Sequence, residues 1–263
     1  MKIMVCAKQV PDAEGIKKDP ESNGIILEGV PEILNPYDGY ALEAAARLKD
    51  KDPETKIVVL TAGPEKARAA LKDCLGIAAD KAYLAQTDKL EDADTLATAR
   101  VLAAAIKKVE EAEGKFDAIF CGKQSTDWES AQVGAALAEL LGYPQLTVGL
   151  ECEPDAGGLK VSQQAENGKS LVSISLPCLI TFTQPGYDPR FPTIKRKMAA
   201  NKAVIPVLSE AELGLDAACT APVTSVKNTF APAKRSGGLL IAEESMEENA
   251  ARLASLLSEA HVI

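Results

Sequence analysis

Histidine is almost absent from this sequence of 263 residues, because His261 is the only one. It stands near the end of the printed sequence. A Ser-His-Asp or Cys-His catalytic arrangement needs a histidine as its general base, and a single histidine in this position offers none. The sequence therefore argues against a conventional hydrolase.

Closely spaced cysteine pairs are also missing. The six cysteines are scattered, mostly in apolar segments, and no two of them form a C-x-x-C pair. This absence excludes the usual iron–sulfur and zinc spacings, so we predict no metal site, and it argues against a disulfide framework. The six are Cys6, Cys74, Cys121, Cys152, Cys178 and Cys219.

Positive charge is in short supply, with 29 lysines and arginines against 38 aspartates and glutamates. The resulting net charge of −9 argues against a nucleic-acid-binding surface. No apolar run is long enough to cross a bilayer, and the residues after Met1 lack a signal-peptide pattern. We therefore expect a cytoplasmic protein that binds neither nucleic acid nor a membrane.

Aromatic residues make up only 4% of the sequence, although hydrophobic residues as a whole make up 46%, so the expected core is aliphatic. Up to Leu141, short apolar runs alternate with helical patterns, which predicts a doubly wound, mostly parallel α/β sheet of the nucleotide-binding kind. After Pro144, three strand-like segments at 146–152, 159–164 and 171–175 predict an antiparallel extension. A last buried strand is expected at 177–183.

Local signals add detail in the first part of the chain. Lys2 to Lys8 reads as the first strand, and Gly24 to Val30 as a small hairpin. Asp38 is a good capping residue for the helix that follows the Asn35-Pro36 turn. Lys56 to Leu60 is the expected second strand.

The end of the sequence differs in character from the rest. Residues 206–239 show little core periodicity, and so long a structureless stretch is unusual inside a compact domain. We predict an α/β domain over residues 1–205, followed at 206–263 by an extended arm and a helix at 244–257. The arm and helix would dock on another subunit.

The stretch from Phe116 to Leu141 is the first candidate for a functional site. It reads as a buried strand, a tight loop at Gly122 and an amphipathic helix. Such a loop lies at the carboxyl end of a strand, where the N–H groups of a helix start favour a phosphate. An alternative remains open, because Thr126 and Glu129 form a capping-box pattern that would satisfy the same donors without a ligand.

Several segments together resemble the small (β) subunit of electron-transfer flavoproteins, along essentially the whole chain. The matching segments are VCAKQVPD at 5–12, NPYDGYALEAAARLKD at 35–50, AGPEKARAALKDCLGIAAD at 62–80, CGKQSTDWESAQVG at 121–134, LPCLIT at 176–181 and DPRFPTIKRKM at 188–198. The resemblance implies a partner, the large (α) flavin-binding subunit, in a heterodimer. It also implies a nucleotide-binding-like fold that extends a loop and a C-terminal arm onto that partner.

The resemblance further implies a nucleotide site. In ordinary carriers of the family the nucleotide is a structural AMP, whereas in the electron-bifurcating branch the pocket holds a second FAD that takes a hydride from NADH. The implied cofactor-binding residues are Ala7, Asn35, Asp38, Ala62, Gly63, Asp94, Thr95, Thr98, Gly122, Lys123, Gln124, Ser125, Thr126, Asp127, Ala131, Gln132 and Val133. Trp128 either neighbours the nucleotide or packs on the surface.

The segment Asp94 to Thr98 resembles the bifurcating pattern, in which threonine hydroxyls and backbone amides at a helix start hold the flavin diphosphate. Thr95 and Thr98 are three residues apart and fall on one helix face. The alternative is that Asp94 or Thr95 merely caps the helix. The acidic residues Glu91 and Asp92 precede this helix, and we expect no specific role for them.

The resemblance thus implies an electron-transfer subunit that binds FAD and takes electrons from NADH for bifurcation. The electrons would pass to a low-potential acceptor, ferredoxin or flavodoxin, and to an acyl-CoA or hydroxy-acid dehydrogenase. NADH oxidation is expected only in the heterodimer with its partner dehydrogenase. A non-bifurcating carrier with structural AMP is the alternative, and a free-standing nucleotide-binding regulatory module is a third interpretation.

A docking site for the dehydrogenase is implied near residues 190–198. Ile194 matches the apolar anchor of the family's recognition loop, and Lys195, Arg196 and Lys197 follow it. Such a basic run is commonly a solvated face, so its role in partner binding comes from the resemblance alone.

Overall fold

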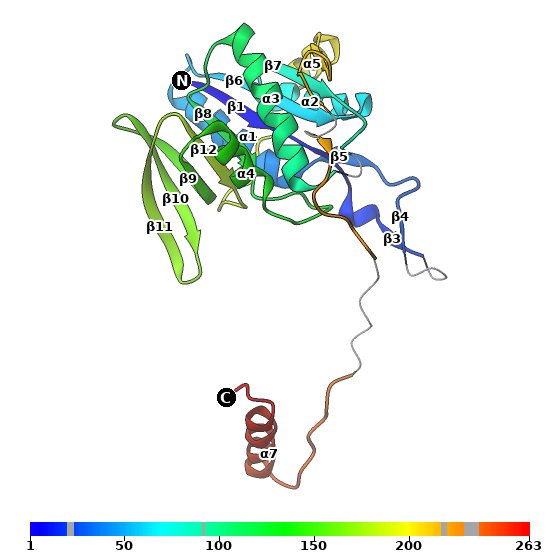
Figure 1. The fold of residues 1–263 in the computed structure, drawn as a ribbon. Helices are drawn as coiled ribbons and strands as arrows, with labels where there is room; N and C mark the ends of the chain where they lie inside the picture. Colours follow the sequence, from blue (N-terminus) through cyan, green and yellow to red (C-terminus); the bar gives the residue numbers. More distant parts are fainter. Residues whose placement is uncertain (20–23, 91–92, 217–219, 229–236) are drawn as a thin grey trace.

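The computed structural model describes residues 1–19, 24–90, 93–216, 220–228 and 237–263. Its centre, within these ranges, is a nine-stranded sheet in the order β11-β10-β9-β12-β8-β1-β6-β7-β13 (Figure 1). The strands are β1 Lys2–Cys6, β6 Lys56–Gly63, β7 Lys81–Gln86, β8 Ala118–Gly122, β9 Gln145–Asp155, β10 Gly158–Ala165, β11 Gly168–Ser175, β12 Cys178–Phe182 and β13 Val207–Ser209.

The strands from β9 through β12, β8, β1, β6 and β7 to β13 pair in parallel. Successive strand residues point to opposite faces of the sheet, so both faces carry apolar side chains. Helices cover both of these faces. Ile3 and Val5 join the core under α1 and α2, whereas Met4 and Cys6 join the core under α3 and α4. The helices are α1 Pro36–Lys51, α2 Arg68–Ile77, α3 Thr95–Glu113 and α4 Val133–Leu141. The predicted doubly wound sheet is confirmed.

The predicted antiparallel extension is also confirmed. β9, β10 and β11 form a meander in which each strand runs against its neighbour. β12 then returns parallel to both β8 and β9 and is buried along its whole length, as expected for a last core strand. The extension forms one edge of the sheet (Figure 1).

Two small sheets lie outside the main one, and here one prediction is wrong. β2 Gln9–Pro11 pairs with β5 Glu32–Leu34, and β3 Lys17–Lys18 pairs with β4 Ile25–Ile26. The hairpin expected within 24–30 does not form. Ile25–Ile26 pairs with an earlier segment instead, and the chain turns at 27–30, where the Val30 N–H donates to the Leu27 carbonyl. Two short 3-10 helices are η1 Ala13–Gly15 and η2 Glu65–Ala67.

The C-terminal part begins within the sheet. α5 Ile194–Lys202 packs on α2, and β13 then adds a parallel edge strand to β7, so residues 207–209 of the expected arm belong to the sheet. The expected terminal helix is confirmed as α7 Met246–Glu259, with a capping box formed by Ser245 and Glu248. No residue of α7 is buried, and Figure 1 shows it set apart from the sheet. Throughout the described ranges, no helix has the length and apolar character needed to cross a membrane.

Candidate functional site

A cavity of about 750 Å³ opens beyond the carboxyl ends of β1, β6 and β8. Ligands of open α/β sheets bind in this crevice, and the volume is in the range of about 300–1,000 Å³ usual for small-molecule sites. Most residues that the resemblance assigned to a nucleotide line it: Ala7, Asn35, Asp38, Ala62, Asp94, Thr95, Thr98, Gly122, Lys123, Gln124, Ser125, Ala131, Gln132 and Val133.

Three of the assigned residues are not among the lining residues. Gly63 ends β6, and its carbonyl accepts a hydrogen bond from the Thr87 N–H. Asp127 forms an ion pair with Lys8, 2.7 Å between Oδ2 and Nζ, next to Ser125 on the cavity wall. Thr126 lies between Ser125 and Asp127 in the same loop. The structure thus places these three beside the cavity.

Asp38 joins three elements at the cavity floor. Its Oδ2 accepts from the Lys8 N–H at 2.7 Å, and its Oδ1 accepts from the Gly122 N–H at 3.0 Å. Burial raises the pKa of Asp38 to about 7, against the opposing effect of the Asn35 side chain, of these two hydrogen bonds and of the Lys8 charge. The prediction that Asp38 caps α1 is wrong, because Asn35 is the N-cap and the Asp38 carboxylate is used by distant backbone donors.

Asn35 carries a buried acceptor that the protein leaves unused. The residue is 1% exposed, and its Nδ2 donates to the Gln124 carbonyl at 2.9 Å. Its Oδ1 accepts no hydrogen bond within the part of the chain that the structure describes. A buried polar atom without a partner is costly, so a cavity-lining acceptor of this kind suits a ligand that offers an N–H or O–H donor.

The loop between β8 and α4 forms a second wall. The capping box expected at Thr126 and Glu129 is wrong, because α4 begins only at Val133 with Gln132 as its N-cap. Glu129 and Ala131 have positive φ values of 50° and 54°, which a continuous α-helix does not permit. The loop therefore stays open, and the start of α4 faces the cavity with Gln132 and Val133.

The start of α3 forms a third wall. Asp94 is its N-cap and accepts from the Ala97 N–H at 2.9 Å, as the capping interpretation predicted. The Thr95 hydroxyl donates to Gln132 Oε1 at 2.7 Å, and the Thr98 hydroxyl donates to the Asp94 carbonyl at 3.0 Å. Two helix N-termini thus converge on one cavity, and both favour a negatively charged group there.

Other lining residues were not expected from the sequence. Trp128, which the sequence left open between a neighbour of the nucleotide and a surface residue, lines the cavity and is 61% exposed, so it lies at the cavity edge. Cys6 and Cys121 could have been found, since they lie at the carboxyl ends of predicted strands. Nothing in the sequence pattern pointed to the residues after 220. The unexpected lining residues are Cys6, Lys8, Leu90, Ala93, Leu102, Cys121, Ser130, Gly134, Pro222, Thr224, Ser225 and Val226.

The expected docking segment is helical from Ile194 onward. Ile194 is 82% exposed, and Phe191 beside it is 89% exposed. Arg196 points inward, because its Nη2 donates to the carbonyls of Leu75 and Ala79 at the end of α2. Lys195 and Lys197 are exposed. The segment therefore presents an apolar surface held in place by an arginine.

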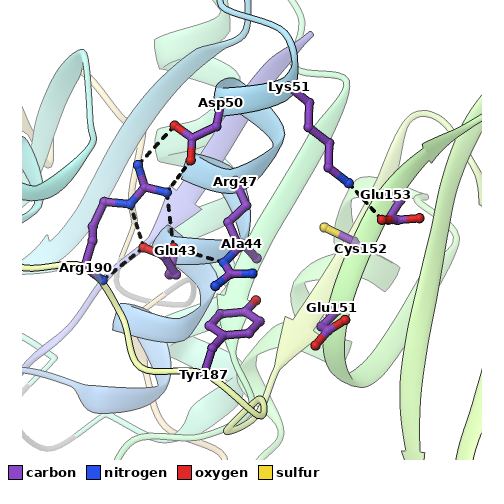
Figure 2. A pocket seen from close by; sticks show the side chains of 10 residues that line it. All are labelled: Glu43, Ala44, Arg47, Asp50, Lys51, Glu151, Cys152, Glu153, Tyr187 and Arg190. Carbon is purple, nitrogen blue, oxygen red and sulfur yellow. Dashed lines mark hydrogen bonds and ion pairs between the residues drawn. The ribbon is translucent and has the colours of Figure 1, made fainter.

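A second cavity, of about 350 Å³, lies between α1, β9 and the segment before α5 (Figure 2). Arg190 fills one side of it, with hydrogen bonds to the buried Glu43 and to Asp50. Arg47 also pairs with Glu43 and lies over the Tyr187 ring, 3.3 Å from its centroid. Because these arginines and carboxylates pair with one another, we interpret the contacts around this cavity as the ones that hold residues 187–190 against α1, and we do not interpret the cavity as a ligand site.

Neither the cysteines nor a cluster of possible metal ligands forms another candidate site among the described residues. Five free cysteines are all buried, and Cys219 lies outside the described ranges, as do Glu91 and Asp92. Burial raises the pKa of the Cys152 and Cys178 thiols to about 12, and it also raises the pKa of the Cys74 thiol. In the same ranges, no group of three histidine, cysteine, aspartate or glutamate side chains is arranged to hold a metal ion.

Comparison with known proteins identifies the family. Residues 23–213 match the electron transfer flavoprotein domain. The chain is 42% identical to the electron transfer flavoprotein subunit beta of Megasphaera elsdenii, over 95% of this chain and 94% of the relative. It is 40% identical to subunit CarD of the caffeyl-CoA reductase-Etf complex of Acetobacterium woodii, over the full length of both chains.

A further relative, protein FixA of Azotobacter vinelandii, is 39% identical over 90% of this chain and 86% of its own length. The predicted resemblance is thus confirmed, and it covers the sheet, the cavity and the C-terminal part alike. The chain belongs to the electron transfer flavoprotein family, among its beta subunits.

Proposed function

We propose that this chain is the small subunit of a heterodimeric, electron-bifurcating flavoprotein and that the large cavity binds FAD. The observation that carries the proposal is the convergence of the α3 and α4 N-termini on a cavity that is also lined by Asn35, whose buried Oδ1 has no hydrogen-bond partner within the described residues. The first feature suits a diphosphate, and the second suits a group with hydrogen-bond donors. Both belong to a dinucleotide.

The residues have distinct parts in holding such a group. Thr95, Thr98 and the backbone at Gln132 and Val133 would bind the diphosphate, with the helix dipoles adding partial positive charge. Lys123 lines the cavity and adds a full positive charge. Asn35 Oδ1 would accept from an amine or hydroxyl of the adenosine end. Gly63, Thr126 and Asp127 would shape the loops around these contacts.

Bound there, a flavin supplies hydride acceptance from NADH and one-electron transfer to two acceptors. We assign the remaining chemistry to partners. A large α subunit would carry the other flavin, ferredoxin or flavodoxin would accept low-potential electrons, and an acyl-CoA or hydroxy-acid dehydrogenase would accept the rest. The relative from A. woodii belongs by name to a complex with a caffeyl-CoA reductase, which supports an acyl-CoA partner.

The C-terminal part supports the heterodimer. Leu239 and Leu240 are 73% and 88% exposed, and Met246 at the start of α7 is 86% exposed. Exposed apolar side chains on a segment with few contacts to its own domain favour a partner surface that buries them. We propose that the arm predicted at 206–263 docks on the large subunit through these side chains of residues 237–263, whereas its earlier part, including β13 and the buried Leu213, packs on the α/β domain.

A carrier subunit with structural AMP is the second candidate, and one observation favours it. The hydroxyls of both Thr95 and Thr98 already have acceptors in the protein, so neither hydroxyl needs a ligand. An AMP held by Asn35 and the loop at 122–132 would leave these bonds intact. FAD would take the Thr95 hydroxyl away from Gln132.

Removing the two hydroxyls tests the choice between FAD and AMP. A Thr95→Ala/Thr98→Val variant of the heterodimer should lose one of two flavins and its reduction by NADH, because each charge-assisted hydrogen bond contributes about 1.5–3 kcal/mol. The control Thr147→Val alters a threonine on the exposed side of β9 and should keep both flavins. Full flavin content in the double variant would remove the two threonines from the proposed site.

A further inference from the structure

A fourth wall of the cavity comes from the C-terminal part of the chain. Residues 220–228 follow β13 by about a dozen positions and run past the start of α3. Four of them line the cavity: Pro222, Thr224, Ser225 and Val226. This 220–228 segment belongs to no helix or strand, apart from a single helical residue assigned at Thr220.

One carboxylate holds this segment to the rest of the molecule. Asp94 Oδ2 accepts from the Val223 N–H at 2.7 Å, from the Thr224 N–H at 2.9 Å and from the Thr224 hydroxyl at 3.2 Å. Its other oxygen, Oδ1, caps α3 through Ala97. The same hydrogen bonds, with the Ala97 bond as the largest contribution, lower the pKa of Asp94 and keep it ionised at neutral pH. Asp94 therefore links the cofactor wall at α3 to the segment that faces it.

Within the described residues, a second anchor is Thr220 at the start of the segment, which is buried and whose hydroxyl donates to the Asp216 carbonyl at 3.4 Å. Residues 221–228 are all exposed, and Val223 and Val226 are 67% and 64% exposed although they are apolar. A segment with few buried contacts opens at a low free-energy cost, so its position depends on the hydrogen bonds that it does make. Three of these converge on a single side chain.

We propose that the 220–228 segment is a cover over the nucleotide cavity, and that Asp94 holds it closed. Thr224 and Ser225 would face the bound nucleotide, and release of the Asp94 clamp would precede nucleotide exchange. Asp94 is a positioning residue in this scheme. The inference rests on the proposed nucleotide site and adds to it a means of controlling how long the nucleotide stays.

The test distinguishes the role of Asp94 in holding the 220–228 segment from its role as the N-cap of α3. Asp94→Ser keeps a capping oxygen for α3, since serine is as good an N-cap as aspartate, but it has no second oxygen for the segment. Val223→Pro approaches the same contact from the other side, because proline has no N–H to donate. Lys227→Ala is the matched control, since it changes the same segment at a residue that neither lines the cavity nor contacts Asp94.

Nucleotide release from the heterodimer is measured for each protein. Release of FAD is followed by its fluorescence after dilution, and release of radiolabelled AMP by filter binding. Asp94→Ser should release the nucleotide at least tenfold faster than wild type, Val223→Pro should also speed release, and the double variant should be no faster than Asp94→Ser. Unchanged release rates, or effects of the two substitutions that multiply, would overturn the clamp.

Hydrogen exchange supplies a readout that needs no nucleotide. The amides of residues 223 and 224 should exchange faster in Asp94→Ser than in wild type, whereas those within α3 should be unchanged. If wild-type protein takes up neither FAD nor AMP, the proposed function fails, and the exchange rates still decide whether Asp94 holds the segment. Equal exchange at 223 and 224 in both proteins contradicts the proposal.

Discussion

The close approach of α1 to β8 at Gly122 leads to the most detailed prediction. A Cβ at this position would lie 2.7 Å from Tyr37 Cβ, 2.9 Å from the Asp38 nitrogen and closer still to Asp38 Oδ1. Carbon atoms in ordinary contact are about 3.5–4.0 Å apart, so a Gly122→Ala variant forces the start of α1 to move by roughly 1 Å.

The expected cost follows from two terms. Overpacking of a well-packed site costs about 1–3 kcal/mol. The shift also strains the bond from the Gly122 N–H to Asp38, and a hydrogen bond of this kind contributes about 1–2 kcal/mol. We therefore expect Gly122→Ala to lower the free energy of unfolding by roughly 2–5 kcal/mol, or the melting temperature by roughly 5–15 °C. Because Asn35 and Asp38 move together, nucleotide affinity should fall as well.

Gly39 provides the matched control on the same helix. A Cβ there meets no atom within 4 Å, and alanine is the better helix former by about 0.5–1 kcal/mol. Thermal unfolding of the nucleotide-free proteins, followed by circular dichroism, should thus show Gly39→Ala at or above wild type and Gly122→Ala well below it. Equal melting temperatures for Gly122→Ala and wild type would refute the reasoning about α1 and β8.

Three further predictions concern charge and docking. Burial raises the pKa of Asp38 from 3.8 to about 7, so the folded state holds this proton more tightly than the unfolded state, and the Asp38 contribution to stability falls as the pH rises from about 4 to 7. Urea unfolding at pH 5 and 8 should show wild type losing about 2–3 kcal/mol more than Asp38→Asn, and identical pH dependence would contradict the assignment. Arg190→Met should cost roughly 2–4 kcal/mol because it removes one of the two cations paired with the buried Glu43 and leaves Arg47 and the residue 190 N–H as its partners. Adding Glu43→Gln should restore part of the loss, and a double variant less stable than Arg190→Met would argue against the network. Ile194→Ala should leave stability within about 0.5 kcal/mol and flavin content unchanged, yet slow electron delivery to the dehydrogenase, and unchanged delivery would remove Ile194 as an anchor.

The main sheet was predictable because its signal is local. β1, β6, β8 and β12 are apolar runs bounded by turn residues, and their burial on both faces produces that pattern. The crevice followed from the topology, because parallel strands end at the same edge. Motif resemblance then supplied most of the cavity-lining residues.

The start of α4 was not predictable from local signals. Thr126 and Glu129 have the spacing of a capping box, but long-range contacts hold the loop open instead. Lys8 pairs with Asp127, and Asn35 binds the Gln124 carbonyl, across more than 80 positions of sequence. Asp38 likewise reads as a cap, yet the backbone of Gly122 occupies its carboxylate.

The 220–228 segment shows a second limit. Asp94 binds it mainly through backbone N–H groups, and every residue except proline has such a group. A contact of this kind leaves no pattern in the sequence. Only the three-dimensional structure brings Pro222 to Val226 to the cavity.

The nucleotide content of the purified heterodimer tests the central claim most directly. The protein is co-purified with its large subunit, denatured, and its FAD and AMP are separated and quantified against protein concentration. The proposed function predicts two FAD and no AMP per heterodimer. One FAD with one AMP would contradict bifurcation and leave a carrier subunit with a structural nucleotide.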